Sequence, residues 1–204
     1  MSAIRLIQYV FGYAMVTLSS VAEYPNKRIN AQKVDNLSYV GVDNLLQDKK
    51  GKTVASYIPT TGNLTEFQCE DILIGNIRPY LRKIWFSNIV GGTNGDVLVI
   101  RSKNTKQVLL SRYLYHVLSS ERFFIYDNNN AKGAKMPRGN KEAVMNYQFC
   151  IPVIKEQQRI IGILDRFDSL CNDLSSGLPA EIEARQKQYE YYRDKLLSFK
   201  ELKK

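Results

Sequence analysis

The spacing of the apolar residues changes once along this chain of 204 residues, close to Pro152. Before that point, short apolar and β-branched runs alternate with clusters of Gly, Asn and Thr, a pattern that predicts strands joined by turns. After it, Ile160, Leu164 and Phe167 follow at four- and three-residue intervals, the spacing of one helix face. We therefore expect an α+β (mixed α/β) globular domain followed by a helical, coiled-coil-like C-terminal region.

The expected strands are short, and the expected helices lie mostly after residue 154. Ser111 is a candidate N-cap for one earlier helix over residues 111–124. Gly177 predicts the end of a helix that begins near Lys155, and Pro179 predicts the start of a second helix that runs to about residue 200. Strands are predicted at residues 39–42, 71–74, 84–86 and 97–101, with turns at 60–63 and 91–95. The domains expected are an unassigned segment at 1–15, a globular domain at 16–153 and a helical region at 154–204 with a break near 177–179.

The second C-terminal helix carries residues at heptad spacing, which predicts a seam that needs a partner helix. Two partners are open: the first helix of the same chain, in an antiparallel hairpin, or a helix of another chain. The predicted seam residues are Ile182, Arg185, Tyr189, Tyr192, Leu196 and Phe199.

The net charge is strongly positive, with 29 Lys and Arg against 20 Asp and Glu, which gives +9. Residues 1–150 hold 19 basic and 11 acidic residues, a net +8, whereas residues 151–204 hold 10 and 9, a net +1. The excess therefore belongs to the globular segment. A surplus of this size favours a polyanionic partner, most often nucleic acid.

Motifs that carry catalysis are missing from the sequence. No Gly-x-Gly-x-x-Gly opens a helix, and Leu46 stands where a phosphate-binding loop ending at Gly51-Lys52-Thr53 would need its first glycine. The single histidine, His116, lies inside the predicted helix and is expected to be a packed or a surface residue rather than a catalytic base. Three distant cysteines and one histidine leave too few ligands for structural zinc. We expect no catalytic residue, no metal, no cofactor and no membrane span, in a cytoplasmic protein with reduced thiols.

Two stretches of the globular segment concentrate basic and aromatic residues and lack acidic ones. The first lies between Asp71 and Asp96, and the second lies between Asp127 and Glu142. Lys and Arg bind phosphates, while Arg and Asn can also pair with base edges. A solvated loop explains the second stretch equally well by composition, but two such stretches in the charged segment favour DNA. The predicted contacts are Asn76, Arg78, Tyr80, Arg82, Lys83, Asn94, Lys132, Lys135, Arg138 and Lys141.

These same residues carry a resemblance to a known family. DILIGNIRPYL at 71–81 and GGTNGDVLVIR at 91–101 look like a target recognition domain of the specificity (S) subunit of type I restriction–modification systems. GAKMPR at 133–138 with IPVIKEQQRI at 151–160 resembles the junction of that domain with the family's conserved helical region. Three further segments of the chain are similar to the family's conserved helical region itself: LDRFD at 164–168, GLPAEIEAR at 177–185 and YYRDKLL at 191–197.

The resemblance implies a DNA-recognition subunit without catalytic activity of its own. Family members use two recognition domains, each of which reads half of a bipartite target, and paired helices set the spacing and dock the methyltransferase (M) subunits. The implied partners are double-stranded DNA, M subunits and, through them, restriction (R) subunits, which would bind S-adenosylmethionine, ATP and magnesium.

This chain has one recognition domain and one helical region, so it resembles half of an S subunit. We expect a homodimer through the C-terminal helices. The alternative is a truncated or silent copy that acts only as a structural or regulatory partner.

Overall fold

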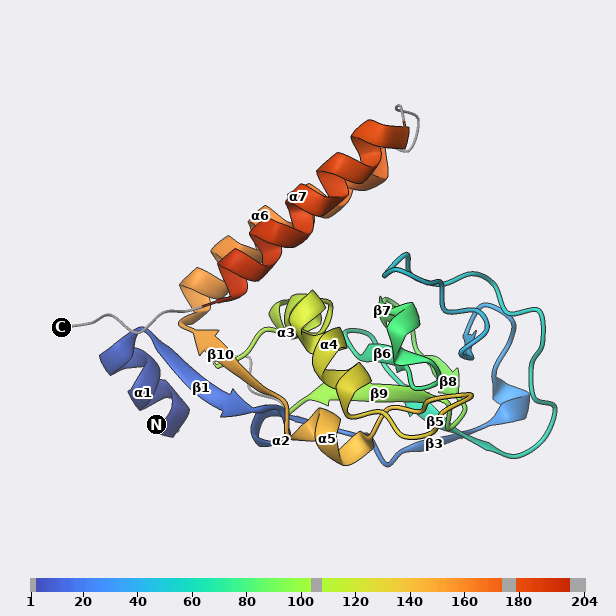
Figure 1. Cartoon of the computed structure of the whole chain (residues 1–204). Coiled ribbons are helices and arrows are strands. Elements are labelled where there is room, and N and C mark those ends of the chain that lie inside the picture. Colours follow the sequence, from blue (N-terminus) through green and yellow to red (C-terminus); the bar gives the residue numbers. More distant parts are fainter. Residues whose placement is uncertain (1–2, 104–107, 174–178, 199–204) are drawn as a thin grey trace.

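The computed structural model of the chain describes residues 3–103, 108–173 and 179–198. Figure 1 shows a globular body from which two long helices project together as an arm. The described helices are α1 (Ala3–Phe11), α2 (Leu18–Val21), α3 (Ser111–Leu118), α4 (Glu121–Asn129), α5 (Lys141–Met145), α6 (Ile154–Asp173) and α7 (Pro179–Leu197), with short 3-10 turns η1 (Ala31–Lys33) and η2 (Pro79–Leu81).

The strands form two four-stranded sheets and one two-stranded sheet within the described residues. The central sheet has the order β2 (Ala22–Glu23), β9 (Val97–Ser102), β6 (Ile72–Gly75), β7 (Ile84–Phe86). The second sheet has the order β3 (Arg28–Asn30), β5 (Asn63–Phe67), β8 (Gly91–Thr93), β4 (Tyr39–Val40), and β1 (Tyr13–Thr17) pairs with β10 (Gln148–Pro152). The mixed α and β architecture followed by C-terminal helices confirms the predicted fold class.

The central sheet is buried on both faces, which explains the uninterrupted apolar runs of β6 and β9. Ile72 and Ile74 face the main core, to which α3 and α4 contribute Leu114 and Phe123. Leu73, between them, belongs to a smaller core shared with the second sheet. Since successive side chains of a strand alternate between faces, a strand covered on both sides must be apolar throughout.

Strand β8 occupies residues that were predicted to form a turn. Gly91 and Gly92 lie in this strand, between β5 and β4, because nothing larger fits there. A Cβ atom on Gly91 would stand 2.0 Å from the Ser38 carbonyl oxygen and 2.6 Å from the Phe67 ring. The turn prediction was therefore wrong for residues 91–93: these glycines permit close packing rather than a reversal of the chain.

The globular body begins before residue 16. Strand β1 pairs antiparallel with β10, from Tyr13 opposite Pro152 to Thr17 opposite Gln148, so the expected boundary falls inside a paired strand. Helix α1 precedes it and is anchored by Gln8, whose buried side-chain amide donates to the carbonyls of Ile151 and Pro152 at 3.2 and 3.0 Å. These contacts join the first residues of the chain to the last strand of the body.

The helix predicted over residues 111–124 is interrupted. Helix α3 ends at Leu118 and α4 starts at Glu121, with Ser120 as its N-cap, since the Ser120 hydroxyl accepts from the Phe123 backbone N–H at 3.3 Å. Leu110, not Ser111, precedes the first turn of α3. The interruption arises because side-chain capping by Ser120 competes with helix continuation. No side-chain cap is made at the start of α3, where Leu110 holds the N-cap position.

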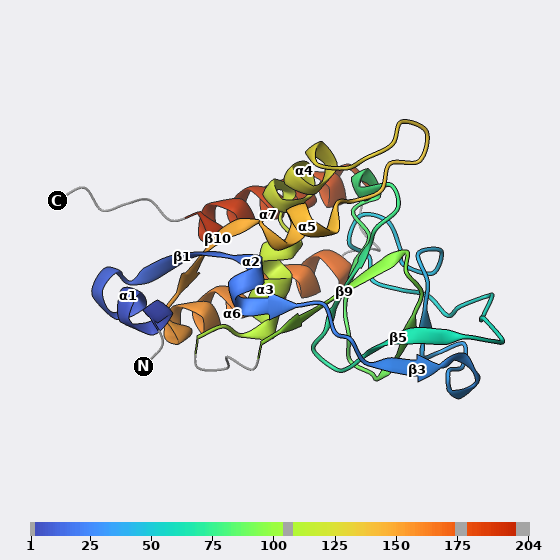
Figure 2. The ribbon, with the colours of Figure 1, turned by 90° about the horizontal axis from the view of Figure 1, so that it is seen from below.

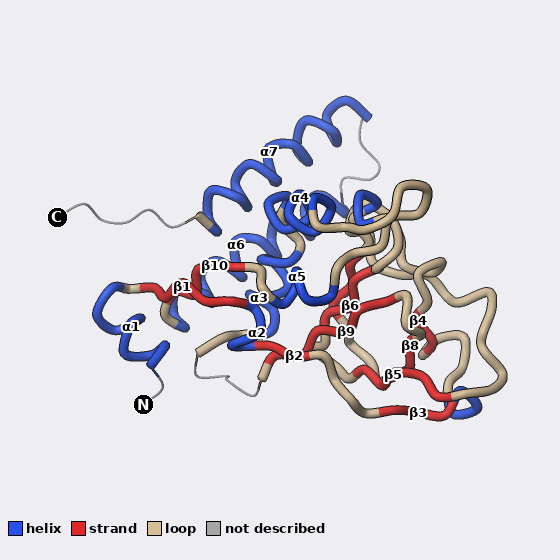
Figure 3. The backbone as a smooth tube through the Cα atoms, turned by 60° about the horizontal axis from the view of Figure 1, so that its bottom comes forward, coloured by secondary structure: helices blue, strands red, loops and turns tan. Residues whose placement is uncertain are grey.

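The two C-terminal helices lie side by side and run in opposite directions (Figures 1 and 3). The ring of Phe167 on α6 lies 6.0 Å from that of Tyr189 and 6.3 Å from that of Tyr192, both on α7. Leu196 packs, half-buried, against the main core, and the Arg185 side chain is exposed. Seam residues Tyr189 and Tyr192 thus contact the first helix of the same chain.

Some C-terminal predictions fall outside the described part. The side chains of Ile182 and Phe199 and the segment 174–178 are not described, so the expected break at 177–179 and the ends of the seam stay predictions. Helix α6 ends at Asp173 and α7 begins at Pro179.

Candidate nucleic-acid interface

The two acid-free stretches, separated in the chain by residues 96–127, lie against each other in the fold. Residues 132–138 form a hairpin in which Lys132 and Arg138 exchange backbone hydrogen bonds of 2.9 and 2.8 Å. The hairpin then docks beside the end of β6: the Arg78 N–H donates to the Pro137 carbonyl at 2.8 Å, and the Gly139 N–H donates to the Asn76 carbonyl at 2.9 Å. Two backbone hydrogen bonds therefore fix one stretch relative to the other, and two more close the hairpin itself.

The turn that follows β6 has an unusual backbone. Arg78 and Arg82 both adopt left-handed conformations, with φ of 52° and 51°, on either side of η2. Pro79 is the first residue of that 3-10 turn, and the fixed φ of proline suits this position. Non-glycine residues rarely take positive φ, and such conformations persist only where neighbours hold them. Here the turn projects Tyr80, which is about half exposed.

Six of the ten predicted contact residues are exposed and form what we call the basic surface. Arg138 also makes a 3.0 Å ion pair with Asp96, which joins the hairpin to the loop before β9. Figure 2 shows the hairpin, the yellow loop between α4 and α5, at the edge of the body opposite β3. The members of the basic surface are Arg78, Tyr80, Lys132, Lys135, Arg138 and Lys141.

Three other predicted contacts use their side chains to hold the protein together. The Arg82 guanidinium bonds Asp48 and Glu121 at 2.8 and 2.9 Å, and these hydrogen bonds raise its pKa although burial opposes them. The Lys83 ammonium donates to the Val42 carbonyl at 2.6 Å, and burial lowers its pKa. The Asn94 side-chain oxygen accepts from the Asp96 N–H at 3.1 Å.

Asn76, the tenth predicted contact, is buried, so its side chain faces the interior beneath the hairpin instead of solvent. Its Oδ1 and the Oδ1 of buried Asp127 have no hydrogen-bond partner among the described residues. Burial raises the pKa of Asp127 to about 6. The prediction that Asn76 contacts a base was wrong, because this side chain is buried beneath the hairpin. It helps to support the hairpin instead, next to Asp127 of α4.

A partly buried polar network joins the body to the helical arm, with His116 and Arg193 as its buried members. His116 Nε2 lies 2.8 Å from Asp165 Oδ1, and Arg112 reaches the same oxygen at 2.8 Å. Although burial would raise the pKa of Asp165, these hydrogen bonds hold it at about 2. Arg193 of α7 donates to the Ser119 carbonyl at 3.2 Å and lies 3.4 Å from Asp168.

The network also brings three possible metal ligands, His116, Asp165 and Asp168, within 4.8 Å of one another. Their carboxylates already face Arg112 and Arg193, and two cations so close oppose a third. Burial lowers the pKa of His116, so this residue is a packed, neutral histidine, one of the two noncatalytic places that the sequence left open for it. The donor set fits an ion-pair joint better than a metal centre.

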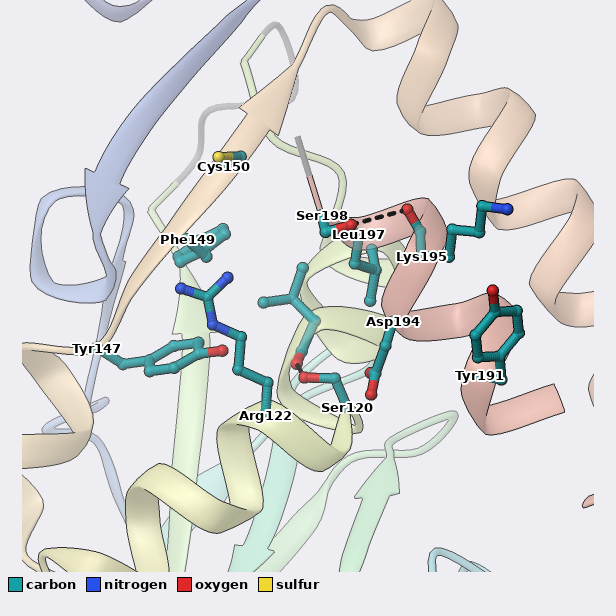
Figure 4. A pocket seen from close by; sticks show the side chains of 11 residues that line it. Ser120, Arg122, Tyr147, Phe149, Cys150, Tyr191, Asp194, Lys195, Leu197 and Ser198 are labelled. Carbon is teal, nitrogen blue, oxygen red and sulfur yellow. Dashed lines mark hydrogen bonds between the residues drawn. The ribbon is translucent and has the colours of Figure 1, made fainter. Parts of the chain in front are cut away.

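A hollow of about 530 Å³ lies between α4, β10 and the end of α7 (Figure 4). Arg122, Tyr147 and Phe149 line one side, and Tyr191 and Asp194 line the other. The nearby Cys150 thiol is buried, which raises its pKa and keeps it protonated and unreactive. The hollow thus contains no activated nucleophile among its described lining residues.

A basic surface on an α+β body is typical of a protein that recognises nucleic acid. The model of the type I restriction modification DNA specificity domain family matches residues 12–184. The chain therefore belongs to this family, which confirms the resemblance found in the sequence. In the described part of the chain, no helix is long and apolar enough to cross a membrane.

Curated relatives are named as type I specificity subunits, the class of subunit that the sequence resembled. The Escherichia coli EcoR124I/EcoR124II specificity subunit is 44% identical over 91 residues, which are 45% of this chain and 22% of that protein. A putative type I specificity subunit from Haemophilus influenzae is 38% identical over 104 residues, 51% of this chain and 26% of its own length.

Solved structures show the same fold. The HsdS subunit from Thermoanaerobacter tengcongensis matches with a TM-score of 0.59 and 20% identity, over 90% of this chain and 46% of that one. The S subunit from M. genitalium matches with a TM-score of 0.54 and 14% identity, over 81% of this chain and 41% of that one. This chain therefore spans about half the length of the solved subunits that it matches.

Proposed function

We propose that this chain is a DNA sequence-recognition subunit of a type I restriction–modification complex and reads one half of a bipartite target. The observation that supports this most directly is the docking of the two acid-free stretches through two backbone hydrogen bonds, Arg78 to Pro137 and Gly139 to Asn76. Five cations and one tyrosine are thereby exposed on the basic surface, where phosphates can be neutralised and bases approached.

The helical arm then serves as spacer and as the dock for methyltransferase subunits, and restriction subunits join through them. Methylation and ATP-dependent cleavage belong to those partners, and the complex works in the cytoplasm. The polar network around Asp165 and Arg193 supports this role, since it ties the arm firmly to the body that would read the DNA.

Reconstitution tests the proposed function. The chain is combined with its cognate methyltransferase subunit, and methylated bases are mapped on random-sequence DNA. We expect methylation within one recurring sequence motif. Methylation without any sequence preference in the presence of this chain would contradict recognition and would favour the rival view of a truncated or silent copy that serves only as a structural or regulatory partner.

Charge reversal tests the basic surface. We expect Lys135→Glu with Arg138→Glu to lower affinity for the specific site more than tenfold and to make the salt dependence shallower by about two ions, because two phosphate contacts are lost. The fold should survive, since the hairpin is held by backbone groups.

The matched control is Arg28→Glu with Lys33→Glu, which makes the same change in charge on β3 and η1, away from the hairpin (Figure 2). Fluorescence anisotropy of labelled DNA measures both double variants. Equal losses of affinity in the two would remove the hairpin from the interface and leave only a general effect of net charge.

A further inference from the structure

The turn at residues 78–82, which contributes to the basic surface, is bonded to a second turn from a distant part of the chain. The Asp48 N–H donates to the Leu81 carbonyl at 3.0 Å. The Lys49 N–H donates to the Arg82 carbonyl at the same distance. The Asp48 carboxylate also accepts from the Arg82 guanidinium at 2.8 Å. Two backbone hydrogen bonds and one ion pair thus fix the 78–82 turn to the 48–49 turn.

Both turns contain residues in left-handed backbone conformations. Asp48 and Lys49 have φ of 53° and 63°, and Arg78 and Arg82 have φ of 52° and 51°. In the part of the chain that the structure describes, five non-glycine residues have positive φ, and four of them belong to these two turns. Such conformations cost free energy, persist only where neighbouring groups hold them, and cluster at functional sites. The shape of the 78–82 turn therefore depends on the contacts of the 48–49 turn.

Lys49 connects the 48–49 turn to the helical arm. Its ammonium lies 2.8 Å from the Glu190 carboxylate on α7. The Lys49 side chain is 10% exposed and the Glu190 side chain 27%, so water screens this pair less than it screens a pair at the open surface. An ammonium enclosed in this way holds the two turns to the arm and is poorly placed to neutralise a phosphate.

We infer that Lys49 and Glu190 are positioning residues for DNA recognition, an inference that rests on the proposed function. Their ion pair holds the 48–49 turn, and that turn holds Arg78 and Tyr80 in the geometry in which they approach DNA. Phosphate contacts give affinity for any sequence, whereas the reading of bases needs fixed geometry. Loss of the pair should therefore weaken binding to the specific sequence and spare binding to other sequences.

The variant Glu190→Gln tests the inference in the complex of the full chain with its methyltransferase subunit. Fluorescence anisotropy measures affinity for DNA that contains the methylated motif and for DNA in which the motif is scrambled. We expect affinity for the motif to fall about fivefold, a partial loss because the Arg82–Glu121 ion pair still holds the 78–82 turn. Affinity for scrambled DNA should stay equal or rise slightly, because the variant gains positive charge.

The matched control is Glu183→Gln, which makes the same change in charge at an exposed ion pair on the same helix. This control should bind the motif as the wild type does. Urea denaturation verifies that each variant is folded.

A double-mutant cycle shows whether Lys49 and Glu190 act on each other. We expect Lys49→Met to weaken binding to the motif about as much as Glu190→Gln does, and the two changes together to weaken it no further. Exchange of the two charges, in Lys49→Glu with Glu190→Lys, should restore most of the affinity for the motif, because the ion pair is formed again.

Several results would overturn the inference alone. In a complex whose wild type prefers the motif, these are an unchanged preference in Glu190→Gln, an equal loss in Glu183→Gln, additive losses in the cycle, and no recovery on exchange of the charges. A wild-type complex that binds both DNAs equally would contradict the proposed function, and the inference with it.

Discussion

Gly139 shows how tightly the support beneath the basic surface is built. An added Cβ there would stand 2.7 Å from Asn76 Oδ1 and 3.0 Å from Asp127 Oδ1. Neither oxygen has a hydrogen-bond partner among the described residues, and burial raises the pKa of Asp127 to about 6. Composition predicted a base contact for Asn76. That prediction was wrong because the sequence does not distinguish an exposed Asn from a buried one.

The raised pKa of Asp127 predicts that the stability of the fold depends on pH. The unfolded chain releases this proton near pH 3.8 and the folded chain near pH 6, so folding takes up a proton between these values. Its contribution to stability therefore falls as pH rises through this window and stays low above it. We expect Asp127→Asn to raise the free energy of unfolding at pH 7 by roughly 1–3 kcal/mol and to change little below pH 4.

Urea denaturation across this pH range measures the effect, with the exposed Asp43→Asn as control. A gain in stability that is the same at pH 4 and pH 7 would mean that packing, and not the carboxylate charge, is responsible.

Among the elements, strands β6, β7 and β9 could be predicted because apolar residues fill them, whereas β8 could not. Its glycines have the composition of a turn, and the reason for them, the backbone of Ser38 and the ring of Phe67, comes from distant parts of the chain. The helix predicted over residues 111–124 was likewise too long. Ser120 caps a new helix instead of continuing the first, and the spacing of apolar residues does not reveal this choice. Periodicity thus predicted whether a segment forms a helix or a strand. Contacts with other residues decided where the helix at 111–124 breaks and that the glycines of β8 form a strand.

Gly91 in β8 and Gly95 in the turn that follows it make a matched pair of glycine variants. We expect Gly91→Ala to lower the free energy of unfolding by roughly 2–4 kcal/mol, because its Cβ would overlap Ser38 and Phe67. Gly95→Ala, where no atom lies within 4 Å of the new Cβ, should change stability by less than about 0.5 kcal/mol. Thermal and urea denaturation of both variants compare them, and similar losses would contradict the close approach at β8.

At the scale of the whole molecule, the joint between body and arm decides where the arm points. Arg193 is buried, lies 4.2 Å from the Tyr189 ring centroid, and connects α7 to α3 and α6 through Ser119 and Asp168. Burial lowers its pKa, and also raises that of Asp168. Lys49 adds a 2.8 Å ion pair to Glu190. The arm is therefore held by charged groups that have little access to water.

Removal of one partner from a buried ion pair leaves the other charge without compensation, which lowers the stability of the fold. We expect Arg193→Met to lower the free energy of unfolding by roughly 3 kcal/mol, since the Asp168 carboxylate would lose its buried partner. Lys187→Met, which removes an exposed pair with Glu183, should leave the free energy of unfolding almost unchanged, because water screens that pair. Urea denaturation measures both, and equal effects would show that the joint contributes no more than a surface ion pair.

The sequence by itself determined the class of fold, the change from strands to helices near Pro152, the location of the charge and the family, because periodicity, composition and motif spacing are local properties. Only the tertiary structure decided that Asn76 is buried, that Arg82 and Lys83 bind within the protein, and that the seam contacts α6. Burial and partner choice depend on which distant segments meet. Side-chain chemistry states what a residue can bind, and packing selects which of those partners it reaches.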